Sequence, residues 1–346
     1  MADDDMCCGC AALDSDVDYN MGLHVGAIFI LFGISAAGAL LPFVSKHVPL
    51  LSANGIIIEW LMAFGFGVVI ATGFIHMMND GIEKLSNQCL GEVVENYESL
   101  GMTVVLATIV VMHLIECESA VFFASKGGSH GHSHGHNAIT QSAAASSSGT
   151  GDDSVAVSVN VAVAPTPNDE VNSYKKLTDA THNEKTLNKK LAMMLFELGV
   201  IFHSVIIGID LGITVGTEFK TLLAAICFHQ FFEGIAIGGS ALSSIESTKN
   251  VMLMNMVYAV TTPIGLAIGI GIRSTYSETS VTSLWVQGTL NCIAAGILLY
   301  TGLVELLTYQ MTTNGQFLTR VGNQRFALYL ALWLGAGLMA LIGKWA

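Results

Sequence analysis

Charged side chains are scarce in this sequence: only 12% of its 346 residues are Asp, Glu, Lys or Arg, while 52% are hydrophobic. A soluble domain carries about 25% charged residues, so this composition excludes an ordinary soluble globular protein. Eight apolar runs are each long enough to cross a ~30 Å hydrocarbon core as a helix. The sequence therefore predicts an all-α polytopic membrane protein with transmembrane helices at about 23–44, 56–78, 101–124, 192–216, 220–242, 251–272, 284–307 and 325–345.

Lysine and arginine are absent from the interiors of these spans, whereas six acidic side chains lie in them or at their edges. A pathway lined by acids and without bases favours cations. The acidic residues are Glu59, Glu116, Glu197, Asp210, Glu233 and Glu305.

Most basic residues lie in the odd-numbered loops, which predicts that these loops are cytosolic and that both termini lie outside. The first 20 residues also lack a basic segment. We therefore expect no cleavable signal peptide, with the first span acting as the anchor.

The odd number of cysteines, seven, excludes a fully paired set of intramolecular disulfides. Three of them cluster near the N-terminus as Cys7-Cys8-Gly-Cys10. This cluster could bind a soft metal ion or form a disulfide outside the cell, and an unconstrained tail is the plainer interpretation.

The chain divides into an acidic tail (1–22), spans one to three (23–124), a long connection (125–190) and spans four to eight (191–346). The connection is rich in Ser, Ala and Gly, and this composition predicts disorder. Alternating histidines on such a segment can chelate Zn²⁺ or a similar ion without a fold. These loop histidines are His130, His132, His134 and His136.

A weak internal repeat relates the second span to the seventh. The segment from Gly67 to His76 aligns without gaps with the segment from Gly296 to Glu305. Because the two spans run in opposite directions, this pattern is typical of the inverted repeats of transporters, although chance similarity between apolar helices is the alternative. The repeat predicts His76 near the outer end of its helix and Glu305 near the inner end of its own.

The fourth and fifth spans carry metal-ligand side chains within apolar sequence. His229 and Glu233 are four residues apart, so both can touch one ion. A turn near Glu218 makes the two spans antiparallel neighbours and sets His203 at a similar depth. Ionisable groups at bilayer depth are costly and mark functional sites. Imidazole with carboxylate suits Zn²⁺, Fe²⁺ or Mn²⁺. The predicted metal residues are His203, Ser204, Asp210, His229, Gln230 and Glu233, with His76, Asp80, Glu197 and Glu305 along the pathway.

Glycines at a spacing of four also run along these two spans: Gly208, Gly212 and Gly216 on the fourth, and Gly234 and Gly238 on the fifth. Small residues at this spacing let helices approach closely. We expect them to bring the fourth and fifth spans together and their ligands within coordination distance.

At these residues the sequence resembles the plant-type branch of the ZIP family of zinc- and iron-regulated metal transporters. The matching motifs are His203-Ser204-x-x-x-Gly208, His229-Gln230-x-x-Glu233-Gly234, Ala259-Val-Thr-Thr-Pro263-x-Gly265 and the closing Leu334-Gly-Ala-Gly-Leu-Met-Ala-Leu-Ile-Gly-Lys344-Trp345-Ala346. The resemblance implies eight spans in a 3+2+3 arrangement, outside termini, a His-rich cytosolic loop and metal movement into the cytosol.

This sequence departs from some ZIP branches, which have Glu at the positions of Ile207 and Thr262. The resemblance therefore implies one principal metal site here, and Asp210 could restore part of the missing negative charge. It also implies that Zn²⁺ or Fe²⁺, with Mn²⁺ also compatible, is the transported ion. We expect no prosthetic group and no nucleic-acid partner, and leave a homodimer open. The plasma membrane is the expected location, with an endomembrane as the alternative.

Three other functions compete with transport into the cytosol. A cation-diffusion exporter would have six spans. A membrane-embedded metal hydrolase needs three ligands, a bound water and a general base, and the sequence contains no His-Glu-x-x-His. A metal-sensing receptor would bind the ion without moving it. We therefore predict a transporter rather than an enzyme, with the hydrolase as the main alternative.

Overall fold

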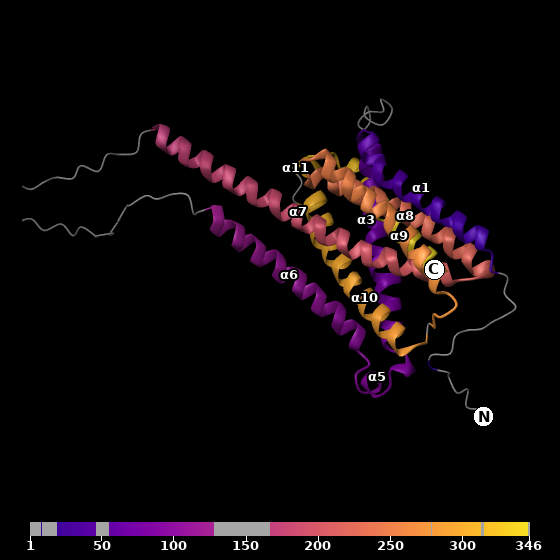
Figure 1. Cartoon of the computed structure of the whole chain (residues 1–346). Helices are drawn as coiled ribbons and strands as arrows, with labels where there is room; N and C mark the ends of the chain where they lie inside the picture. Colours follow the sequence, from indigo (N-terminus) through magenta and orange to yellow (C-terminus); the bar gives the residue numbers. More distant parts are fainter. Residues whose placement is uncertain are drawn as a thin grey trace, which may run out of the picture. The chain divides into compact units, whose positions relative to one another are not determined.

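The computed structural model describes residues 8, 19–45, 55–127, 167–277, 279–312 and 315–344. Every regular element in this part of the chain is helical (Figure 1). The elements are α1 (Met21–Ser45), α3 (Gly55–Ala71), η1 (Thr72–Met78), α4 (Asn79–Leu85), η2 (Gln88–Leu90), α5 (Glu92–Asn96), α6 (Leu100–Gly127), α7 (Pro167–Ile213), α8 (Gly216–Ser244), α9 (Thr248–Ile272), α10 (Val281–Tyr300), η3 (Thr301–Thr312), α11 (Gly315–Leu318) and α12 (Gly322–Ile342).

The prediction of eight membrane-spanning helices is confirmed for the described residues. The spans are Met21–Ser45, Ile56–Leu85, Leu100–Ser119, Lys190–Ile213, Gly216–Ser244, Thr248–Ile272, Val281–Thr308 and Gly322–Ile342. The second span is longer than the predicted 56–78, because α3 continues through η1 and α4 without a break. This extension places Lys84 in the last turn of a spanning helix rather than in a loop.

The two segments of the internal repeat change helix type at the same aligned position. The α-helix gives way to a π-helix at Thr72 in the second span and at Thr301 in the seventh. A π-helix widens the turn and occurs often at functional sites. This shared irregularity supports the repeat, and it places His76 within the π-helical turns.

Glycines bring helices together, but the partners differ from those we predicted. A Cβ on Gly208 would lie 2.5 Å from the Thr262 oxygen of α9, and one on Gly238 would lie 2.1 Å from the Ala39 oxygen of α1. The stripes therefore pack α7 against α9 and α8 against α1, so the expected contact of the fourth and fifth spans through glycine is wrong.

Gly216 does not belong to the stripe on the fourth span, because α7 ends at Ile213. Its φ of 65° begins α8 in a conformation that disfavours a side chain. The turn lies at Thr214 and Val215, slightly earlier than the predicted position near Glu218.

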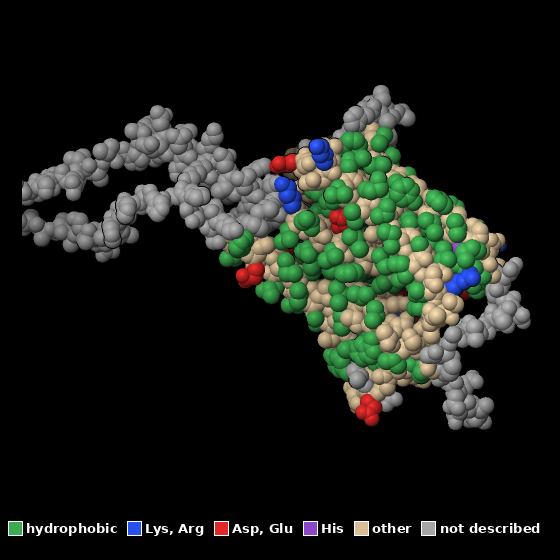
Figure 2. All heavy atoms as spheres, in the orientation of Figure 1, with side chains coloured by type: hydrophobic (Ala, Val, Ile, Leu, Met, Phe, Trp, Pro, Cys, Tyr) green, Lys and Arg blue, Asp and Glu red, His purple; other side chains and the backbone are tan. Residues whose placement is uncertain are grey.

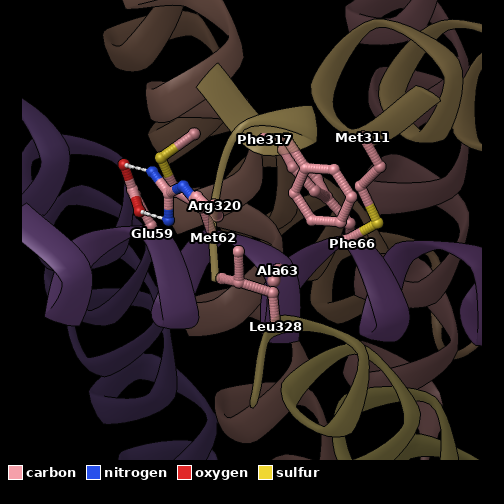
Figure 3. Close-up of a pocket in the computed structure, with 8 residues that line it drawn as sticks. All are labelled: Glu59, Met62, Ala63, Phe66, Met311, Phe317, Arg320 and Leu328. Atoms are coloured by element: carbon pink, nitrogen blue, oxygen red, sulfur yellow. Dashed lines mark hydrogen bonds and ion pairs between the residues drawn. The ribbon is translucent and has the colours of Figure 1, made fainter. Parts of the chain in front are cut away.

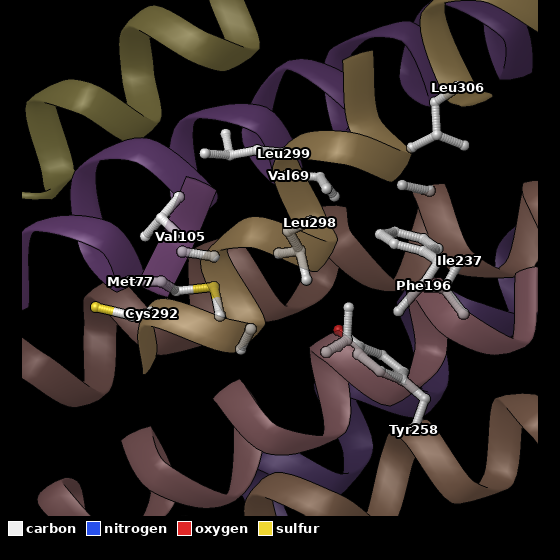
Figure 4. Packing of buried hydrophobic residues seen from close by; sticks show 14 of the residues in the cluster. Val69, Met77, Val105, Phe196, Ile237, Tyr258, Cys292, Leu298, Leu299 and Leu306 are labelled. Carbon is white, nitrogen blue, oxygen red and sulfur yellow. The ribbon is translucent and has the colours of Figure 1, made fainter. Parts of the chain in front are cut away.

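The largest buried apolar cluster lies where α7, α8, α9 and α10 pack on the second span. Figure 4 shows Val69, Phe196, Ile237, Tyr258 and Leu298 converging from these helices. Hydrophobic side chains also cover most of the face shown in Figure 2, with Lys and Arg only at its margins. Apolar surface on a helical bundle of this length fits a lipid environment.

Residues 118–187 form a unit separate from the rest of the chain. We expected disorder from residue 125, yet α6 continues to Gly127 and α7 begins at Pro167. The segment from Pro167 opens with Pro, Asn, Asp and Glu and continues with many Lys, Leu and Ala residues, a pattern that favours a helix. The four loop histidines, His130 to His136, lie outside the described residues.

A disulfide joins Cys8 to Cys89, which precedes α5. Of the alternatives for the N-terminal cysteines, the disulfide applies to Cys8. Cys7 and Cys10 lie outside the described residues.

Candidate metal centre

Three potential ligands from two consecutive helices meet inside the bundle. One ligand atom from each of His203, His229 and Glu233 lies within 4.8 Å of the other two. In a tetrahedral zinc site with bonds near 2.1 Å, ligand atoms lie about 3.4 Å apart, so small side-chain rotations would bring these three onto one ion. All three side chains are at most 4% exposed. Within the described ranges, no other group of three His, Cys, Asp or Glu side chains has this geometry.

The local helices account for this geometry. His229 and Glu233 are one turn apart on α8, and their side chains share one face. The turn at Thr214 and Val215 returns the chain antiparallel to α7, which sets His203 opposite them. The hydroxyl of Tyr258 on α9 donates to the backbone oxygen of Gln230 and fixes this part of α8 against α9.

His76 lies next to this cluster rather than near the end of its helix. Its ring centroid is 5.8 Å from that of His229, which is 5.9 Å from that of His203. The predicted position at the outer end of the helix is therefore wrong, because α4 adds seven residues beyond η1. The π-helical turns of η1 place this imidazole beside the cluster.

Buried polar atoms without a hydrogen-bond partner concentrate at this point. Leaving such an atom unpaired costs about 1–3 kcal/mol, and a native interior contains few of them. Their accumulation around one point indicates a site built for a polar or charged ligand. They include Thr72 Oγ1, His76 Nε2, Glu197 Oε1, His203 Nε2, Ser204 Oγ, and both side-chain nitrogen or oxygen atoms of His229, Gln230 and Glu233.

A cavity of about 200 Å³ extends from the cluster toward one end of the bundle. Its inner part is lined by His76 and His203, and its outer part by Asp80, Glu83 and Asp210. Glu83 and the lining residue Asn79 are exposed, so the cavity reaches the surface there. A cation entering from this end would meet acidic side chains before it met the imidazoles.

The acidic end of the cavity, in contrast to its inner part, is internally paired. Lys84 Nζ lies 3.1 Å from Asp80 Oδ1, and the side-chain amide of Asn291 donates to Asp80 Oδ2. Lys84 also interacts electrostatically with Asp210 of α7. We call these four residues, Asp80, Lys84, Asn291 and Asp210, the mouth cluster.

The remaining predicted residues are distributed unevenly. Ser204 and Gln230 are buried next to His203 and His229 in the sequence, and their polar side-chain atoms lack a hydrogen-bond partner. Asp210 is outside the three-ligand group and lines the cavity instead. Glu197 is buried two turns before His203 on α7. The side chain of Glu305 lies outside the described part of the structure.

Sequence reasoning missed Asn291 and the role of Lys84. Asn291 is a polar residue within the apolar α10, and it is only 3% exposed. That isolated amide was the available signal. Lys84 follows Asp80 by four residues, a spacing that predicts a pair on a helix, but the helix was expected to end before it.

A second cavity, of about 70 Å³, lies at Glu59 and Arg320 and is apolar over most of its lining. Figure 3 shows the two side chains joined by two hydrogen bonds, of 2.5 and 2.7 Å, beside Met62 and Phe317. These bonds raise the pKa of Arg320, so its charge persists at any physiological pH. Because Glu59 is already paired with Arg320 and the other lining residues are apolar, this cavity is less suited to a metal ion than the first.

The fold and the site together define a class. A bundle of eight membrane-spanning helices holds a buried His/Glu cluster that an acidic cavity connects to one surface, which is the construction of a membrane transporter for metal ions. The profile of the ZIP zinc transporter family matches residues 21–343. The chain belongs to this family.

Relatives cover nearly the whole chain. It is 39% identical to zinc transporter 8 of Oryza sativa subsp. japonica, over 97% of this chain and 91% of the relative. It is 34% identical to zinc-regulated transporter 1 of Saccharomyces cerevisiae, over 94% and 88%. It is 33% identical to Fe(2+) transport protein 1 of Arabidopsis thaliana, over 94% and 86%. The predicted family is confirmed, and the members named here are transporters rather than enzymes.

Proposed function

We propose that this protein carries Zn²⁺, Fe²⁺ or both across its membrane into the cytosol, with His203, His229 and Glu233 as the ligands of the ion in transit. The observation that carries the proposal is the convergence of these three buried side chains, most of whose ring nitrogens and carboxylate oxygens lack a hydrogen-bond partner. The names of the relatives, which include both zinc and iron transporters, support these two ions. Nitrogen and oxygen ligands suit both, and Mn²⁺ is also compatible.

The direction of transport follows from the proposed orientation. The excess of Lys and Arg in the odd-numbered loops supports a cytosolic position for these loops. The disulfide between Cys8 and Cys89 supports an oxidising environment for the N-terminal tail and for the loop after the second span. Both support a position outside the cytosol for the acidic end of the cavity, in the plasma membrane or in an endomembrane.

The ion then enters past Asp80, Glu83 and Asp210. His76 binds it next and transfers it to the central ligands. His76 is suited to this role because its ring lies 5.8 Å from that of His229 and faces the same cavity. The ion leaves past Glu197 and Glu305 toward the opposite end. The related π-helices of the two repeat segments support an alternating-access mechanism around the central site.

Vesicles containing the purified full chain would test the proposal. Uptake of Zn²⁺, measured with Fe²⁺ and Mn²⁺ as competitors, should exceed that of empty vesicles and should rank the three ions. Replacing Glu233 or His229 with Ala should abolish uptake while the protein folds and inserts normally. Normal uptake by Glu233→Ala would contradict the assignment of the site.

The same preparation separates transport from its alternatives. A metal-dependent hydrolase would turn over an organic substrate without net metal flux, and a sensor would bind the ion without moving it. Flux without turnover supports the transporter.

A further inference from the structure

Lys84 is the one described basic residue that contacts the acidic end of the cavity. Its Nζ lies 3.1 Å from Asp80 Oδ1, and the side chain is 21% exposed. It projects from α4 toward a region where α7 contributes Asp210. A cationic side chain in this position is unexpected, because a pathway for cations gains from negative charge alone.

The Asp80 carboxylate has both oxygens engaged by the protein. Oδ1 pairs with Lys84, and Oδ2 accepts from the Asn291 amide. A metal ion can coordinate this carboxylate only after one of these partners has moved. The Asn291 amide is held in the 3% exposed interior of α10, whereas Lys84 sits at the end of a long flexible chain near the surface. The lysine is the partner that can leave.

The charges around Lys84 come from three elements. Asp80 lies on its own helix, Asp210 lies on α7, and the phenol of Tyr276 lies in the link between α9 and α10. Tyr276 is itself held by hydrogen bonds from Ser283 and Gln287. Asp210 is therefore a second negative charge that acts on the Lys84 ammonium from another helix.

Building on the proposed transport function, we propose that Lys84 is a tethered competitor of the incoming metal ion: its ammonium offsets one of the two negative charges of Asp80 and Asp210, and a divalent cation must displace it from Asp80 to enter. Lys84 then sets the external concentration at which uptake saturates. It disfavours monovalent and weakly bound cations, since only an ion that repays the lost Lys84–Asp80 contact can hold the carboxylate. After the ion has passed, the Lys84 ammonium returns to Asp80 and restores the original charge state of the mouth cluster.

The plain alternative is that Lys84 stabilises α4 through its pair with Asp80, four residues earlier on the same helix. Such pairs are common and contribute little at exposed positions. The two readings differ in what the positive charge does to the metal. A helix-stabilising pair changes the amount of folded protein, whereas a competitor changes the affinity per molecule.

Zn²⁺ uptake into vesicles, measured against Zn²⁺ concentration and normalised to the amount of inserted protein, separates the two. Removing a unit charge a few ångströms from a divalent ion changes its local occupancy by about three- to tenfold in a partly hydrated site. Lys84→Met should therefore lower the half-saturating Zn²⁺ concentration about three- to tenfold. Lys84→Arg, which keeps the charge, should stay within about twofold of the parent. Lys220→Met is the matched control: this exposed lysine begins α8 at the same end of the bundle, and its loss should leave the half-saturating concentration unchanged.

An unchanged or raised half-saturating concentration in Lys84→Met would overturn the proposal, as would a Lys84→Arg variant that behaves like Lys84→Met. An absence of uptake by the parent protein would instead contradict the transport function itself.

Equilibrium binding keeps the inference testable even without flux. The chain carrying Glu233→Ala and lacking residues 130–136 has neither the complete central site nor the loop histidines, so Zn²⁺ binding to it reports more strongly on the mouth. Adding Lys84→Met, or Lys84→Gln should Met disturb insertion, should lower the Kd for Zn²⁺ by the same three- to tenfold. An unaltered Kd would exclude competition by the lysine.

Discussion

The central ligands and the mouth cluster both contain carboxylate side chains, but these carboxylates differ in whether the protein itself pairs them. At the centre, His203, His229 and Glu233 are buried, and five of their ring nitrogens and carboxylate oxygens have no hydrogen-bond partner. At the mouth, Asp80 is 40% exposed and pairs with both Lys84 and Asn291. At the mouth the chain itself pairs the Asp80 carboxylate, whereas the centre offers three buried ligands to an ion from outside.

This difference follows from the solvent available at each place. Near the surface, water and salt weaken a charge pair, so a divalent ion can replace the lysine at Asp80, whereas a weakly bound cation does not offset the lost contact. In the interior an unpaired polar atom cannot bond to water, so its free-energy cost persists until a ligand binds. We infer that the mouth selects and releases ions quickly, and that the centre binds them.

Replacing Glu233 at the centre should have the largest effect on uptake. Glu233→Met keeps the side-chain volume and removes a buried carboxylate, so we expect uptake to fall at least about 100-fold because an ion ligand is lost. Since the unpaired oxygens are also removed, the metal-free protein should keep or raise its thermal stability. Ile235→Ala is the control: this fully buried residue of the same helix should lower stability by about 2–5 kcal/mol. A large loss of stability in Glu233→Met would show that its role is structural.

His76 joins the centre to the mouth, and its loss should have the next largest effect. We expect His76→Ala to raise the external Zn²⁺ concentration for half-maximal uptake about tenfold, because the ion loses a ligand on its way to His229. Glu305→Ala should instead lower the maximal rate, because it acts after the central site. Concentration dependence of uptake per inserted molecule measures both. Unchanged affinity and rate in both variants would leave the internal repeat as a feature of folding alone.

Asp80→Asn should have a moderate effect on uptake, and its effect on stability should differ in sign from that of replacing Glu233. It removes the carboxylate that pairs with Lys84 and makes the mouth cluster one charge more positive, so the half-saturating Zn²⁺ concentration should rise about three- to fivefold. Because a native pair is broken, thermal stability should fall slightly rather than rise, by about 0.3–1 kcal/mol. A stability gain like that expected for Glu233→Met would contradict the distinction between a paired mouth and an unpaired centre.

Deleting residues 130–136 should have the smallest effect on transport. The four loop histidines lie outside the membrane path in the proposed topology, so the rate and half-saturating concentration should change less than about twofold. Chelation of Zn²⁺ by the loop should disappear, which binding to a peptide of this sequence would measure beside a His-to-Ser peptide. Complete loss of uptake by a correctly inserted deletion variant would contradict a role limited to capture or regulation in the cytosol.

The sequence by itself determined the features that depend on short stretches of chain. A run of about 20 apolar residues spans a bilayer whatever surrounds it, so all eight helices could be predicted. His229 and Glu233 share a face because they are four residues apart, and their cost in an apolar segment marked them as functional. The family followed from the same motifs.

Only the tertiary structure decided what depends on which helices meet. The glycines of α7 and α8 predicted close approach, but the backbones that they contact, those of α9 and α1, are set by the packing of the whole bundle. His76 lies beside the central cluster because η1 and α4 lengthen the second span, and Lys84 is within electrostatic range of Asp210 for the same reason. Spacing along one helix is fixed by its own hydrogen bonds, whereas the position of one helix against another is a compromise among all their side chains.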